Sequence, residues 1–66
     1  MKTETYNILI DAYASLEEIT IKLYNGADNA VANNDLNDAS LLQSRADILY
    51  VQLEYLDVVI VEHEER

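Results

Sequence analysis

The chain has 66 residues, half of them hydrophobic, and its 13 acidic and four basic side chains give a net charge of −9. A chain of this length forms one domain at most, spanning residues 1–66. Cysteine is absent, which excludes disulfides, thiolate metal ligands and cysteine nucleophiles. The acidic balance argues against direct binding of nucleic acid or anionic lipid, because both require clustered Lys or Arg.

The small size and the hydropathy pattern predict a soluble protein that self-associates. A core this small is marginal by itself, and small folds compensate with disulfides, a metal or oligomerisation. The longest uncharged apolar run, Val58 to Val61, is far shorter than the roughly 20 residues of a membrane-spanning helix. Asp11 and Glu17 come too early for the apolar core of a signal peptide. We therefore expect a cytoplasmic location.

The first part of the chain predicts an amphipathic helix over about residues 5–24. Apolar residues recur at spacings of three and four, and further side chains widen the same face; they are Leu9, Ala12, Leu16, Ile19 and Leu23, with Tyr6, Tyr13 and Thr20 alongside. Gly26 follows, and glycine after a helix adopts the left-handed conformation at little cost, so it is expected to end the helix. The connection is predicted over 25–37, with or without a short helix at 27–34.

The second helix is predicted over about residues 38–63. Its apolar seam repeats every seven residues and consists of Ala39, Leu42, Ala46, Leu49, Leu53, Leu56, Ile60 and His63. The run from Val58 to Val61 would favour a strand in isolation. The repeat continues through it without a turn signal, so a helix is predicted there as well.

A second apolar stripe lies on the same helix, roughly 110° from the seam when residues are placed at 100° intervals. It consists of Leu41, Ile48, Tyr55 and Val59. Two stripes need two neighbours, so we predict an all-α antiparallel helical hairpin that dimerises into a four-helix bundle through this second stripe. A three-helix monomer, with 27–34 as a real helix, is the alternative.

No catalytic, cofactor-binding or metal-binding residue is predicted. The carboxylate-bridged di-iron bundles use Glu-x-x-His, yet Ile60 stands three residues before His63, the only histidine. The acidic and amide residues between Asp28 and Asp35 lack the ligand spacing and central glycine of an EF-hand. The serines have no histidine nearby in the sequence, and the chain has no Gly-rich phosphate loop. We expect a protein that is not an enzyme.

Two short stretches resemble known helical hairpins. Ala46-Asp47-Ile48-Leu49-Tyr50 resembles the Ala-Asp-x-Leu-Tyr stretch in the second helix of Rop-type RNA-binding hairpins, which implies a dimeric bundle; the basic RNA-contacting face is missing here. Ser44-Arg45-Ala46-Asp47 is similar to the Ser-Gln-x-x-Asp signature of Spo0E-like phosphatases. It has Arg in place of Gln and is one residue short, which moves the aspartate by 100° around the helix.

The leading functional hypothesis is a small acidic protein–protein interaction module, a regulator or a phage-type inhibitor of a protein partner. Asp47, Glu54 and Asp57 mark its acidic partner face. The first alternative is nucleic-acid mimicry, in which these carboxylates, with Asp11, Glu17 and Glu18, occupy the basic surface of another protein. The second alternative is a Spo0E-like helical phosphatase of response regulators.

Overall fold

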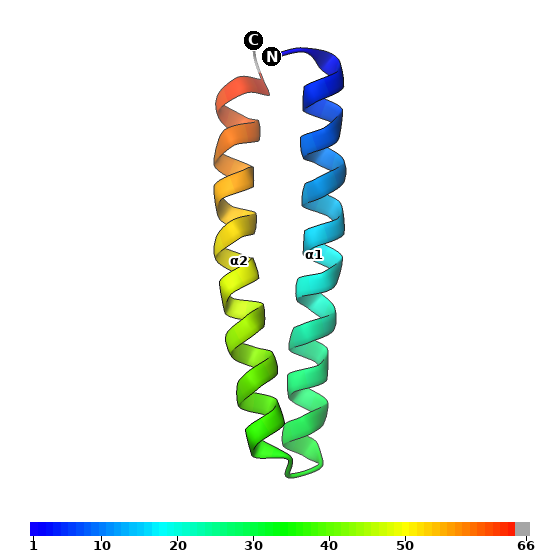
Figure 1. Cartoon of the computed structure of the whole chain (residues 1–66), viewed down its shortest axis with the longest axis vertical. Coiled ribbons are helices and arrows are strands. Elements are labelled where there is room, and N and C mark those ends of the chain that lie inside the picture. The colour runs from blue at the N-terminus through cyan, green and yellow to red at the C-terminus, as the bar shows by residue number, and fades with distance from the viewer. Residues whose placement is uncertain (65–66) are drawn as a thin grey trace.

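The computed structural model describes the backbone of residues 1–64 and the side chains of residues 1–63, so the last two residues of the predicted domain lie outside it. The described residues form two helices and no strand: α1 is Thr3–Ala32 and α2 is Leu36–Glu64. The helices run antiparallel side by side, with the start of α1 and the end of α2 at the same end (Figure 1). The molecule is elongated, with extents of 49 × 14 × 12 Å. The predicted all-α helical hairpin is confirmed.

Helix α1 is longer than predicted, because Gly26 does not end it. The helix continues to Ala32, and no glycine has a positive φ. A glycine inside a helix costs about 1 kcal/mol relative to alanine, and packing offsets this cost here. Ala27, the next residue, and Ala30, one turn further on, are both buried. The short helix considered at 27–34 is thus the last part of α1, and the predicted end at residue 24 is wrong.

The connection is correspondingly short, with only residues 33–35 between the helices. Asn34 has a φ of 62°, its N–H donates to the Val31 carbonyl at 3.0 Å, and the Asp35 N–H donates to the Ala30 carbonyl at 2.8 Å. This pair of bonds is a Schellman motif, in which a left-handed residue caps the helix. Asn34 therefore has the role that the sequence suggested for Gly26. The Asp35 carbonyl accepts the first helical bond of α2, from Ala39, so α2 begins at Leu36 rather than at residue 38.

The predicted seam of α2 faces α1. Ala39, Ala46, Leu53 and Ile60 are buried, and the alternate members Leu42, Leu49 and Leu56 are half-buried. The last predicted member, His63, is exposed. The run from Val58 to Val61 is helical, as the repeat predicted.

The seam of α1 differs in part from the predicted one. Ala12 and Ile19 are exposed, whereas Tyr13 is half-buried and Thr20 is only 2% exposed. The residues facing α2 are Tyr6, Leu9, Tyr13, Leu16, Thr20, Leu23, Ala27 and Ala30. The buried Thr20 hydroxyl donates to the Leu16 carbonyl at 2.7 Å, which satisfies a polar group that would otherwise be costly to bury.

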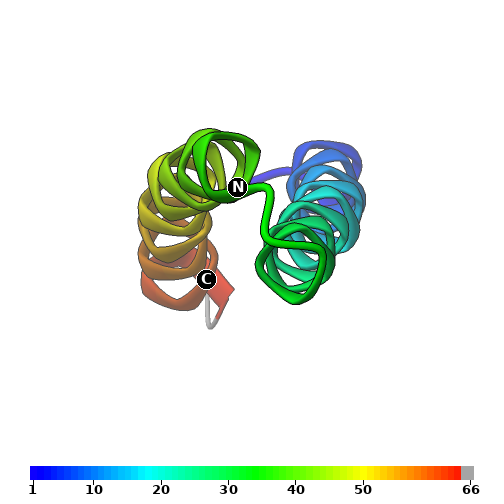
Figure 2. The ribbon, with the colours of Figure 1, turned by 90° about the horizontal axis from the view of Figure 1, so that it is seen from below.

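Residue size varies along the seam. Small residues gather near the connection; they are Gly26, Ala27, Ala30, Ala39 and Ala46. The helices lie closer together at this end and farther apart at the other (Figures 1 and 2). The seam residues at the wider end are tyrosine, leucine and isoleucine. A Cβ atom added to Gly26 would lie 3.3 Å from a methyl group of Leu42. The small residues therefore permit the close approach of the two helices.

Candidate functional site

The four residues predicted to mediate self-association lie on the surface of the single hairpin. Leu41, Ile48, Tyr55 and Val59 are 56%, 50%, 62% and 39% exposed. Each helix has one neighbour within the hairpin, and among the described side chains the buried and half-buried ones lie along or beside the seam between the two helices. Fifteen large hydrophobic residues among those described remain exposed. The second stripe of α2 is thus present and uncovered within one chain.

The rotation of the helices defines two broad faces of the hairpin. In each helix, the seam residues come in pairs whose two members are three residues apart. The residue just before the first member of a pair and the residue two places after that member lie on one side of the seam. The residue just after the first member and the residue just after the second member lie on the other side. In an antiparallel pair, flanking residues of the same type meet on the same side. We call one side the apolar face; it contains Ile8, Ala12 and Ile19 from α1 and Leu41, Ile48, Tyr55 and Val59 from α2.

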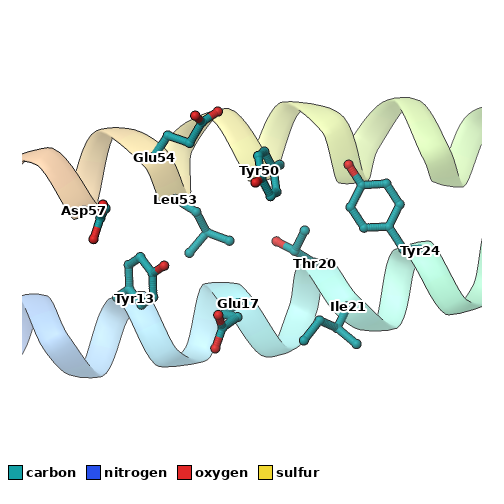
Figure 3. Close-up of a pocket in the computed structure, with 9 residues that line it drawn as sticks. All are labelled: Tyr13, Glu17, Thr20, Ile21, Tyr24, Tyr50, Leu53, Glu54 and Asp57. Atoms are coloured by element: carbon teal, nitrogen blue, oxygen red, sulfur yellow. The ribbon is translucent and has the colours of Figure 1, made fainter.

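The opposite side carries a groove between the helices. Figure 3 shows its lining residues, and it has a volume of about 430 Å³. We call this side the groove face; the groove is lined by Tyr13, Glu17, Thr20, Ile21 and Tyr24 of α1 and by Tyr50, Leu53, Glu54 and Asp57 of α2. Three carboxylates and three phenol groups, drawn from both helices, therefore surround one hollow.

Hydrogen bonding and charge on the groove face act on two tyrosines. The Tyr24 hydroxyl donates to Asp47 Oδ1 at 2.5 Å, a short bond typical of a hydroxyl donating to a carboxylate. This bond raises the pKa of Tyr24, and desolvation and the charge of Asp47 add to the effect. Desolvation raises the pKa of Tyr13, and the negative charges of Asp57 and Glu17 raise it further. In both cases a neighbouring carboxylate adds to the effect by favouring the neutral phenol.

Two of the three carboxylates predicted to form an acidic partner face line the groove, and the third lies outside it. Glu54 and Asp57 line the groove, whereas Asp47 lines a second, more open hollow near Val31. Glu17, proposed only for the mimicry alternative, joins them from α1. Asp11 and Glu18 do not line the groove. Glu18 forms an exposed ion pair with Lys22, with 3.8 Å between Oε1 of Glu18 and Nζ of Lys22.

The sequence did not reveal that tyrosines would line this groove. The sequence spacing predicts only that Tyr13 lies on the same side of α1 as Leu9 and Leu16, and it does not link Tyr13 to Tyr24 and Tyr50. Their shared position depends on which residues of α1 lie opposite which residues of α2. The register of the two helices was the missing information.

The described residues show no ready arrangement for catalysis or metal binding. Among them, no three acidic or histidine side chains are placed to hold a metal ion. The Ser44 hydroxyl donates to the Leu41 carbonyl at 3.0 Å, and Asp47, the aspartate of the Ser44–Asp47 stretch, accepts the bond from Tyr24. Neither α1 nor α2, over the part described, contains a segment long and apolar enough to cross a membrane.

The fold and the groove define an acidic, all-α helical hairpin with two chemically different faces. Comparison with protein-family models, with curated proteins and with solved structures gives no match for this chain.

Proposed function

We propose that the chain is a small non-enzymatic interaction module that associates with another copy of itself and with a protein partner. The observation that carries this proposal is the exposed second stripe of α2. Leu41, Ile48, Tyr55 and Val59 are between 39% and 62% exposed although the hairpin is fully formed. Contiguous exposed apolar surface of this kind marks interaction sites.

The energy available at this stripe is large for so small a protein. Fully burying an aliphatic side chain contributes roughly 1.5–3 kcal/mol, so covering the exposed half of Leu41, Ile48 or Val59 contributes roughly 1 kcal/mol each. A core below about 80 residues rarely supplies more than about 3–5 kcal/mol. Before the entropic cost of association is subtracted, the apolar burial on two copies is therefore comparable to the stability of the isolated hairpin.

The mass of the protein in solution tests self-association. Sedimentation equilibrium over a concentration series should give a dimer at micromolar concentration and monomer only on strong dilution. The unfolding midpoint should rise with protein concentration, because mass action couples dimerisation to folding. A monomer at every concentration, with a midpoint independent of concentration, would contradict the proposal.

A second observation favours a basic protein surface as the partner. Glu17, Glu54 and Asp57 line one groove together with three tyrosines, and tyrosine is enriched in the core of protein interfaces. We propose that this groove face binds cationic side chains of the partner, as an inhibitor that mimics nucleic acid does. Binding of this kind weakens with added salt, because salt screens exposed charges.

Site-specific crosslinking in the cells that make the protein tests the partner face. A photoreactive amino acid at Tyr50, in the groove, should capture a protein that the same group at Asp11 does not capture. Capture should weaken steeply in high salt and with the change Glu54→Gln. Equal capture from both positions, or capture unaffected by salt, would contradict the assignment of this face.

A further inference from the structure

The two broad faces of the hairpin differ in charge far more than in hydrophobicity. Exposed apolar residues occur on both, since the groove face also exposes Ile10, Ile21 and Val31. The carboxylates are distributed unequally. Among the described side chains, the groove face carries five acidic residues by helical position; they are Glu17, Asp28, Asp47, Glu54 and Asp57.

On the apolar face, the described acidic residues lie near its two ends. Asp38 lies in the first turn of α2 and Glu62 lies near the end of the same helix. Between them, the charged residues on this side are Lys22 and Arg45, and the remaining members are apolar or neutral. In a chain with 13 acidic and four basic residues, a face whose centre has cations and no carboxylate is a marked departure from the average.

This distribution indicates what covers the apolar face. We propose that two copies of the chain pack apolar face against apolar face around a two-fold axis, forming a four-helix bundle with both groove faces outward. The inference rests on the proposed self-association and specifies its surface. Each copy carries a net charge of −9, so copies repel wherever carboxylates meet. Packing of groove face against groove face would bring Glu17, Glu54 and Asp57 of both copies together, and these carboxylates would repel each other. Packing through the apolar faces keeps the carboxylates of the two copies apart.

The size of the face fits a dimer interface. The broad face of the hairpin measures 49 by 14 Å, so its area is roughly 700 Å² before side chains are added. Standard protein interfaces bury roughly 800 Å² on each partner, which is close to this area. Both helices contribute to it. Ala12 and Ile19 follow the seam spacing in the sequence but do not face α2. In the proposed dimer they pack against the second copy instead.

Two isoleucines of α1 provide a matched test. Ile19 lies on the apolar face and Ile21 lines the groove, and they are 49% and 53% exposed. Ile19→Glu should weaken dimerisation at least about tenfold, because it places a carboxylate in the interface. Ile21→Glu adds the same charge to a helix position of similar exposure and should leave the dimer constant nearly unchanged. Sedimentation equilibrium measures both, and circular dichroism checks that each variant is helical.

A second measurement leaves the interface intact. The chain has no cysteine, so Ser15→Cys on the apolar face and Ala14→Cys on the groove side each introduce a unique thiol; both positions are exposed in the hairpin. Raising the protein concentration should slow the reaction of the thiol at position 15 with a bulky maleimide and leave the thiol at position 14 unaffected.

The outcomes separate the two proposals. If the unmodified chain is monomeric throughout, self-association itself is wrong. If it dimerises, but Ile21→Glu disrupts the dimer more than Ile19→Glu, or the thiol at position 14 is the protected one, then self-association stands and the assignment of its face is overturned. Equal effects at both positions would also overturn it.

Discussion

The change Gly26→Ala tests the unexpected continuation of α1. Alanine in a helix interior is about 1 kcal/mol more favourable than glycine. Against this, the added Cβ would lie 3.3 Å from Leu42 Cδ1, slightly inside the ordinary 3.5–4.0 Å carbon contact. That methyl group is the end of a flexible, half-buried side chain, so a shift of a few tenths of an ångström relieves the contact. We expect a net gain of about 0.5 kcal/mol.

Chemical and thermal unfolding at one fixed protein concentration measure this gain, which corresponds to a rise in Tm of roughly 2–4 °C. In a Leu42→Ala background the contact is absent, so Gly26→Ala should there give the full gain of about 1 kcal/mol. If Gly26 instead ended the helix in the left-handed conformation, alanine would cost about 1–2 kcal/mol. A loss of that size in both backgrounds would refute the structure of α1 beyond residue 25.

Three further predictions concern the seam, the connection and the groove. Leu53→Ala removes a buried seam side chain and should lower the free energy of unfolding by about 2–5 kcal/mol in urea titrations. Asn34→Ala should cost about 1 kcal/mol in the same assay, because alanine disfavours a φ of 62°; Asn34→Gly should not destabilise. The pKa values of Tyr13 and Tyr24 are raised above 10.0 in the folded state. The stability that these raised pKa values contribute is therefore fully present below pH 10.0, and it is lost as the pH rises through the pKa values of the folded protein. Ultraviolet titration should show these phenols ionising late, and Tyr24→Phe should remove one late component.

The two proposed faces are compatible with each other. A dimer joined through the apolar faces presents one groove face on each side. Such a dimer can engage two basic sites at once, and the second binding event is then intramolecular, which strengthens overall binding without new contacts. Disrupting the dimer should therefore weaken capture of a repeated basic partner more than capture of a single site.

The sequence by itself determined the helical class and the seam of α2. Only the seam from Ala39 to Ile60 has an apolar residue at every step of three and four along the helix, so the rotation that turns this seam towards α1 is favoured. The stripe of Leu41, Ile48, Tyr55 and Val59 followed from the same repeat. These features depend only on the spacing of apolar residues along one helix, which can be read directly from the sequence.

The tertiary structure decided what local periodicity leaves open. Leu9, Leu16 and Leu23 belong equally to a seam with Ala12 and Ile19 or to one with Tyr13 and Thr20, and only packing against α2 selects the second. Gly26 is a helix terminator by local preference and an interior residue once α2 packs against it. The grouping of Glu17 with Glu54 and Asp57 likewise exists only when the two helices are in register, because contacts between distant residues depend on the pairing of whole elements.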